Sequence, residues 1–223
     1  DEADAAVAHP DARVNLNIAV SPSFAQYVLI PRLRAFFALH PEVRLNIRPR
    51  LLSPRDQGER FDAEIQLHTG HVSGMQSRYL CGHEMALVAA PSLLDGHRLD
   101  TPQDLSLTLL KRAQRGYGWD DWRAAMAPDW PGPGPQAPEY EGFSVLMPAL
   151  LHGLGAAIVP LCLVADPLRD GRLVRPFGES VAGRYGYHLM LPQPHSGGLY
   201  LESFCNWVAG MAGDLALPPA RHS

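Results

Sequence analysis

Two turns carry hydroxyl side chains where an expected strand passes into an expected helix. The first holds Ser21, Ser23 and Phe24, and the second holds Ser144 and Val145. Ligands collect at the carboxyl ends of strands in an open α/β sheet, because helix N-termini there present unpaired N–H groups and a positive dipole end. Each serine either caps its helix, which stabilises it by about 1 kcal/mol, or offers its hydroxyl to a ligand carboxylate. Two such turns facing one cleft would hold a small anion.

Two further segments bring polar side chains to the same expected edge of the sheet. His68 and Thr69 end a third alternating run, and Tyr187 lies on a later one. A loop histidine and a core tyrosine are the simpler interpretations, because aromatic side chains usually pack in the core. If these segments instead surround one cleft, the same side chains contact a ligand bound in it. The candidate ligand-binding residues are therefore Ser21, Ser23, Phe24, His68, Thr69, Ser144, Val145 and Tyr187.

The sequence gives little indication of a metal site or of an enzyme active site. The nearest approach to a metal-ligand pattern is His68, His71, Cys81 and His83. Its strand-end and loop spacing lacks the helical HxxxH repeat, so we predict neither a metal nor a cofactor. The sequence has no GxSxG, HExxH, GxxxxGK[ST] or GxGxxG motif. Asp120 and Asp121 have the spacing of the solvated side of a helix, so no catalytic residue is predicted.

Composition excludes several classes of protein. The 223 residues are 46% hydrophobic, which is enough for one large domain or two small lobes. A formal charge of -4 argues against direct binding to nucleic acid. We expect no membrane span, which needs roughly 18 to 20 apolar residues, and a cytoplasmic location, since no signal-peptide pattern opens the chain. Three scattered cysteines indicate reduced core thiols rather than disulfides.

Alternating apolar residues predict strands in the first third of the chain. Residues 14–20, 43–47 and 61–68 each have the period of two typical of a strand. Between the first two lies a helix from Phe24 to about His40, kinked at Pro31. This β-α-β spacing predicts parallel strands joined by a right-handed crossover. A short helix is expected at residues 54–59.

The rest of the chain continues the alternation of strands and helices. We predict strands at 85–90, 107–110, 156–159, 173–177 and 185–191, a helix start at 101–105, and helices at 119–126, 144–154, 161–169 and 199–211. The last helix needs a sheet to cover, and the simplest layout returns it to the first one. Two segments, near Pro91 and near Pro192, then cross as a hinge. The predicted division is a linker remnant at 1–13, lobe I at 14–90 plus 192–217, lobe II at 91–191 and a tail at 218–223.

Short motifs follow one another in a specific order between Val14 and Leu215. They are residues 16–25, Ile30-Pro31-Arg32-Leu33, His40-Pro41, residues 61–65, Ala90-Pro91, residues 101–105, residues 153–160 and residues 171–174. Their order and spacing make the chain similar to the effector-binding domain of LysR-type transcriptional regulators. Trp119 and Trp122, with Pro176-Phe177, resemble the subgroup of the glycine-cleavage activator and the β-lactamase regulator.

The resemblance implies an α/β fold with two Rossmann-like lobes joined by two crossover strands, like type 2 periplasmic binding proteins. An effector, here a small anionic metabolite, binds in the interlobe cleft. The implied partners are that small molecule and further copies of the chain, as a homodimer or homotetramer. DNA is bound only through an N-terminal winged helix-turn-helix, and no membrane is involved. That helix-turn-helix is absent from this sequence, so we expect a fragment that begins in the linker.

The resemblance also assigns roles to individual positions. Ser23 matches the hydroxyl residue that begins the first helix and commonly contacts the inducer. His68 and Thr69 fall where the third strand meets the cleft. Ser144 falls at the start of the helix in lobe II, and Tyr187 on the returning crossover strand.

Two features depart from the family pattern. Pro148 stands where the family keeps an unbroken helix, and residues 131–138 are unusually rich in Pro and Gly, so we expect the lobe II half of the pocket to depart from the family pattern. A solute-binding protein of a transporter, on the same fold, is the alternative function. An enzyme on this scaffold is a third, without a visible nucleophile and base.

Overall fold

The computed structural model describes residues 14–49, 60–96, 99, 101–113, 118–194 and 198–215. Five strands form the larger sheet, in the order β2-β1-β3-β10-β4. They are β1 (Val14–Val20), β2 (Val43–Pro49), β3 (Ala63–His68), β4 (Met75–Cys81) and β10 (Gly186–Pro192). β1 pairs in parallel with β2 and β3, as the β-α-β spacing predicts, whereas β10 runs antiparallel to both β3 and β4.

The helical segment after β1 changes its winding around a proline. It runs through α1 (Pro22–Phe24), the π-helical turn η1 (Ala25–Leu29), the 3-10 turn η2 (Ile30–Arg32) and α2 (Leu33–Leu39). Pro31 has no N–H to give to the carbonyl one turn earlier, and a wider turn followed by a tighter one accommodates that loss. The predicted helix with a defect at Pro31 is confirmed.

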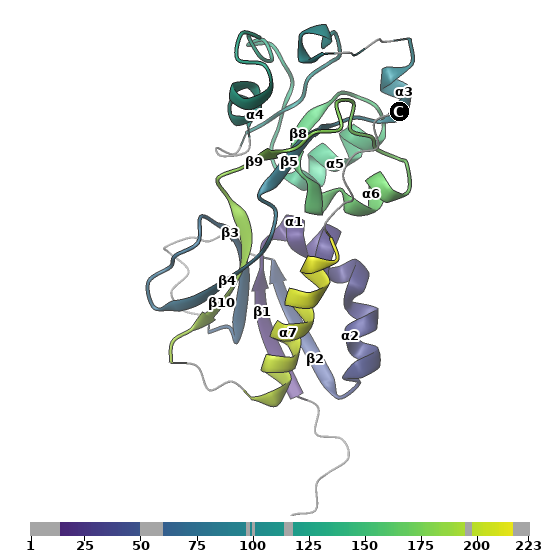
Figure 1. The fold of residues 1–223 in the computed structure, drawn as a ribbon. Helices are drawn as coiled ribbons and strands as arrows, with labels where there is room; N and C mark the ends of the chain where they lie inside the picture. Colours follow the sequence, from purple (N-terminus) through teal and green to yellow (C-terminus); the bar gives the residue numbers. More distant parts are fainter. Residues whose placement is uncertain are drawn as a thin grey trace, which may run out of the picture.

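The final helix, α7 (Leu199–Gly213), returns to the larger sheet and packs against β4. Its buried face includes Phe204, whose ring lies 5.5 Å from that of Phe36 on α2. Trp207 lies 5.2 Å from the same ring. Figure 1 shows α7 and α2 beside the strands of this sheet. The predicted return of the last helix to the first lobe is therefore confirmed.

A second sheet with the order β8-β5-β9 forms the other lobe. Its strands are β5 (Glu84–Val88), β8 (Ala157–Pro160) and β9 (Val181–Ala182), with the short parallel pair β6 (Lys111–Arg112) and β7 (Glu139–Tyr140) nearby. The surrounding helices are α3 (Pro91–Leu94), η3 (Pro102–Asp104), α4 (Trp119–Met126), α5 (Phe143–Leu151), η4 (Leu161–Leu163) and α6 (Ala165–Arg169). Trp119, Trp122 and Trp130 pack together in a separate core with ring centroids 5.7 to 6.2 Å apart.

Two short segments connect the lobes, which stand one above the other in Figure 1. One links β4 to β5 through Gly82 and His83, and the other links β9 to β10 through residues 183–185. The Gly183 amide donates to the His83 carbonyl at 2.6 Å, so the two segments hold each other. Gly82 has φ +100°, and a Cβ there would lie 3.0 Å from the ring of Tyr187. Glycine is therefore needed where the chain crosses.

The predicted lobe limits, 14–90 plus 192–217 and 91–191, require correction. β5 pairs with β8 and β9, so residues 84–88 belong to the second sheet. β10 pairs with β3 and β4, so residues 186–192 belong to the first. The crossings therefore lie at residues 82–83 and 183–185, and not near Pro91 and Pro192. A strand buried on both faces looks the same in sequence whichever sheet it joins.

Several predicted elements are shorter than expected. The strand expected at 107–110 is a single bridge between Leu109 and Ala156, followed by β6, and that expected at 173–177 is a bridge between Val174 and Ala89. The helix expected at 161–169 is split into η4 and α6. β4 was not predicted. The helix expected at 54–59, the linker at 1–13 and the tail at 218–223 lie outside the described residues. None of the helices that the structure describes is long and apolar enough to cross a bilayer.

Candidate functional site

Ser23 and Tyr187 lie 164 positions apart in the sequence and share a hydrogen bond of 2.8 Å. Ser23 follows β1 on α1, and Tyr187 stands near the start of β10, just after the second crossing. The Ser21 hydroxyl lies 3.4 Å from that of Ser23, and the Ser21 amide donates to the carbonyl of Ile65 on β3. Ser21, Ser23 and Tyr187 thus form a hydroxyl cluster at the carboxyl end of β1.

The ring of Tyr187 is buried and held on two sides. Only 1% of the residue is exposed, and its ring centroid lies 5.0 Å from that of Phe24. Phe24 is itself fully buried, so it supports the tyrosine ring from the core. Burial raises the pKa of the Tyr187 phenol well above its usual range, and the nearby Cys162 adds to this. The phenol is therefore neutral at physiological pH and keeps a proton to donate.

A cation near the hydroxyl cluster comes from the other lobe. Arg112 on β6 lies close enough to Tyr187 for its positive charge to lower the pKa of the phenol, as the hydrogen bond from Ser23 also does. These two effects are smaller than that of burial. Sequence reasoning missed Arg112, because the segment around it shows no periodicity and no motif.

The first turn of α5 approaches α1 across the lobe boundary. The two helices contact each other, and the ring of Tyr27 meets that of Phe143 edge to face at 5.3 Å. α5 begins after Gly142, which has φ +80°, so the expected cap at Ser144 is displaced. Pro148 explains the shift, because it has no N–H for the Ser144 carbonyl to accept. Ser144 and Val145 are exposed on this first turn.

His68 lies on a different face of the sheet from the hydroxyl cluster. It stands opposite Gly186 in the β3–β10 ladder, while Leu67 stands opposite Tyr187. Side chains alternate between faces along a strand, so His68 and Tyr187 point to opposite sides. The Nδ1 atom of His68 accepts from the Gly70 amide at 3.1 Å, and Thr69 is exposed. Within the described ranges, no three His, Cys, Asp or Glu side chains are placed to hold a metal ion.

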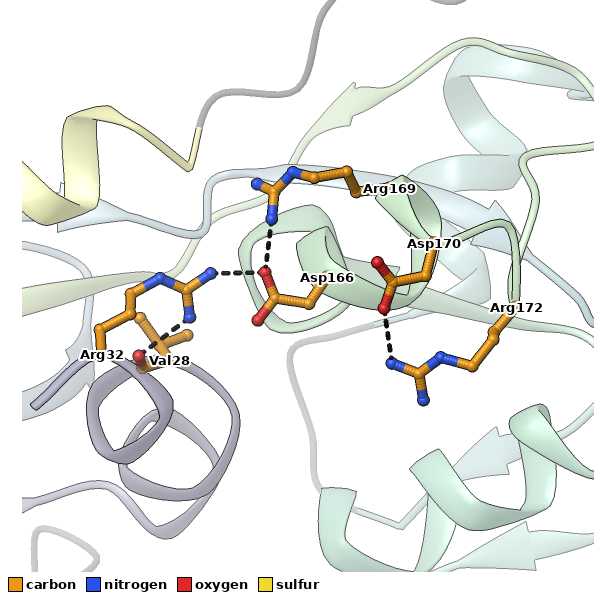
Figure 2. A network of polar contacts seen from close by, with 6 residues as sticks. All are labelled: Val28, Arg32, Asp166, Arg169, Asp170 and Arg172. Atoms are coloured by element: carbon orange, nitrogen blue, oxygen red, sulfur yellow. Dashed lines mark hydrogen bonds and ion pairs between the residues drawn. The ribbon is translucent and has the colours of Figure 1, made fainter. Parts of the chain in front are cut away.

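An ion pair joins the lobes beside α6. Figure 2 shows Arg32 and Arg169 approaching the same carboxylate of Asp166, at 2.6 and 2.8 Å. Arg32 comes from η2 in the first lobe, while Asp166 and Arg169 come from α6 in the second. Arg32 also donates to the Val28 carbonyl at 3.1 Å, which fixes its guanidinium. The pair borders a cavity of about 450 Å³ whose wall includes Trp207.

Comparison with known proteins decides the family. Residues 11–212 match the family described as the LysR substrate binding domain. The chain belongs to this family. The LysR domain is 30% identical over 200 residues to the HTH-type transcriptional activator AmpR of Rhodobacter capsulatus, covering 89% of this chain and 67% of that protein. It is 25% identical over 203 residues to the glycine cleavage system transcriptional activator of Escherichia coli K12, covering 90% and 66%. The chain thus spans about two thirds of the length of these relatives.

Solved structures confirm the fold of the LysR domain. The AmpR effector binding domain of Citrobacter freundii aligns with a TM-score of 0.74 at 24% identity, covering 91% of this chain and all of that one. The CrgA regulatory domain of Neisseria meningitidis aligns with a TM-score of 0.68 at 17% identity, covering 92% and 100%. The expected type 2 periplasmic-binding-protein fold and the expected family, including its subgroup, are therefore confirmed. The named relatives are transcription regulators and not enzymes.

Proposed function

We propose that this LysR domain binds a small anionic metabolite between its lobes and so controls transcription. The observation that carries the proposal is the 2.8 Å hydrogen bond between Ser23 and Tyr187, within electrostatic reach of Arg112. The hydroxyl cluster belongs to the first lobe, and Arg112 belongs to the second. A ligand that contacts both favours one angle between the lobes over others.

The chemistry of these groups favours an anion. The neutral phenol of Tyr187 donates a hydrogen bond to an oxygen of the ligand while its own oxygen accepts one from the Ser23 hydroxyl. The Arg112 guanidinium supplies positive charge and planar N–H donors, which suit a carboxylate or a phosphate. Ser144, Val145 and Thr69, all exposed, contribute from the rim of the proposed site. His68 is left out of it because it points to the other face of the sheet.

A variant of a solved relative supports testing the hydroxyls. The effector binding domain from Citrobacter freundii has been solved with three substitutions: a threonine to valine, a serine to alanine and a tyrosine to phenylalanine. Each of these replaces a hydroxyl-bearing side chain with one that lacks it. We propose to test Ser23, Ser144 and Tyr187 of this chain by substitutions of the same kind, which remove the hydroxyl group.

The path from ligand to transcription lies in the full-length protein. We propose that an N-terminal winged helix-turn-helix precedes this domain, because the matched region covers only about two thirds of its relatives, one of which is an HTH-type activator by name. Effector binding then rearranges a dimer of these domains and changes how the DNA-binding halves meet DNA. The formal charge of -4 agrees with a domain that does not itself contact DNA. As a transcription regulator, the protein would act in the cytoplasm.

Thermal-shift screening against amino acids, aromatic acids and cell-wall fragments will identify a ligand. Calorimetry then measures its affinity for Ser23→Ala, Tyr187→Phe and Arg112→Gln. Each change removes one hydrogen bond or charge contact, so we expect about tenfold weaker binding, or about 1.4 kcal/mol. Tyr200→Phe, a matched change on α7, should bind like the parent. If Ser23→Ala and Tyr187→Phe bind as tightly as the parent, the ligand lies elsewhere.

A further inference from the structure

We propose that the domain carries a second binding site, for a zwitterionic small molecule with an apolar side group, such as a free aliphatic amino acid. The site is a groove of about 280 Å³ between α7 and the edge of the larger sheet formed by β4 and β10. It goes beyond the interlobe site, since its walls contain neither member of the Ser23–Tyr187 pair.

The groove exists because α7 does not fully cover the sheet edge. Leu189 and Leu191 project from β10, and Arg78 of β4 stands directly across the ladder from Leu189. Leu201 and Cys205, four residues apart on α7, face them from the helix. Leu189, Leu201 and Cys205 are each at least 91% buried, so the floor is apolar.

Opposite charges stand on the two walls above this floor. Arg78 projects from the strand, and Glu202 projects from the first turn of α7. Both side chains lie close enough to Cys205 to affect its thiol electrostatically: Arg78 lowers the pKa of that thiol and Glu202 raises it. Within the described part of the chain, neither Arg78 nor Glu202 forms an ion pair.

The arrangement selects one class of ligand. A carboxylate pairs with the Arg78 guanidinium, an ammonium group pairs with Glu202, and an apolar side group covers the leucines. A molecule with only one of these charges leaves the other groove charge unpaired. The volume of about 280 Å³ lies just below the usual range for ligand pockets, roughly 300 to 1,000 Å³, which favours a single amino acid over a peptide.

The groove also has a physical connection to the interlobe site. Tyr187, Leu189 and Leu191 alternate along β10 and so lie on one face of the sheet. A ligand packed on the two leucines therefore contacts β10, the same strand that carries Tyr187 next to the second crossing segment.

L-leucine is the probe for this groove. Calorimetry should detect saturable binding at millimolar concentration, with weaker binding of leucinol and of 4-methylpentanoate, which each lack one charge. Arg78→Gln and Glu202→Gln should each weaken L-leucine about fivefold, the upper range for an exposed ion pair. Arg44→Gln, an exposed arginine on the opposite edge strand, is the matched control. L-leucine should also slow the alkylation of Cys205, followed by peptide mass spectrometry at about pH 9.

Three results would overturn the proposal. The first is the absence of saturable L-leucine binding. The second is binding that Arg78→Gln and Glu202→Gln leave unchanged. The third is binding that Tyr187→Phe abolishes while Cys205 stays unprotected, which would locate the amino acid in the interlobe cleft instead.

Discussion

The Ser23–Tyr187 hydrogen bond predicts an unequal effect of removing either hydroxyl from the ligand-free domain. Tyr187→Phe keeps the ring and its packing on Phe24 and leaves the half-buried Ser23 able to bind water. We expect this variant to lose about 1 kcal/mol of unfolding free energy, the net value of a neutral hydrogen bond. For a chain of this size that lowers the melting temperature by roughly 2 to 4 °C.

Ser23→Ala should lower the unfolding free energy by more than Tyr187→Phe does. It leaves the Tyr187 hydroxyl without this partner in a residue that is only 1% exposed, so water replaces the lost bond less readily there than at the half-buried Ser23. An unsatisfied buried polar group costs about 1 to 3 kcal/mol. The double variant removes both partners, so it should cost less than the sum of the single changes, with a coupling of about 1 kcal/mol.

Urea unfolding at neutral pH measures all four proteins, with far-UV circular dichroism and tryptophan fluorescence compared to check two-state behaviour. Tyr200→Phe on α7 controls for loss of a tyrosine hydroxyl elsewhere. The reasoning is refuted if Tyr187→Phe costs more than Ser23→Ala, or if the two losses simply add. Either result would mean that the tyrosine hydroxyl is not held by the serine.

Two further predictions concern the lobe contact and high pH. Asp166→Asn removes the interlobe ion pair and should cost at most about 1 kcal/mol, because both partners are partly exposed; small-angle scattering should show a more open domain. Asp170→Asn, which breaks a pair within lobe II, should not change the scattering. Burial raises the pKa of the Cys162 thiol and of the Tyr187 phenol, so the folded state keeps protons that the unfolded chain releases. Unfolding free energy should therefore fall above about pH 9, by up to about 1.4 kcal/mol per pH unit for each group. Cys162→Ala should remove the part that begins near pH 9, and unchanged alkaline unfolding curves would contradict this.

The elements best predicted from sequence are those with one buried face. β1 and β2 alternate in burial over most of their length, as they do in sequence, and α4 has the predicted bounds. Strand pairing was harder, because a partner is chosen over long distances and leaves little local trace. β5 is buried on nearly every side chain, so its pattern did not say which sheet it joins. β4 is a polar edge strand, and its alternation of half-buried and exposed residues was too weak to recognise.

The candidate site shows the same limit of sequence-based prediction at the level of single residues. Ser23 and Tyr187 were found from their positions at a strand end and on a returning strand, and the structure brings them into contact. His68 was placed at the correct strand end, but a period of two means that one position decides the face. Arg112 reaches the site through β6, a two-residue strand with no pattern of its own. Short irregular segments are therefore where sequence reasoning is weakest and where ligand-binding groups are often found.

Tyr187 connects the proposed ligand site to the hinge. Its ring closes over Gly82, where a Cβ would come within 3.0 Å, and its hydroxyl holds Ser23. Residues 82 and 183 lie on the two crossing segments, so the tyrosine touches the place where the lobes turn. A ligand that bonds to the Ser23 or Tyr187 hydroxyl replaces the Ser23–Tyr187 hydrogen bond, which is worth about 1 kcal/mol. A free-energy change of that size corresponds to roughly a fivefold change in the ratio of two lobe arrangements. Under the proposed function, this shared residue lets a small ligand shift the lobes without any contact of its own with the crossing segments.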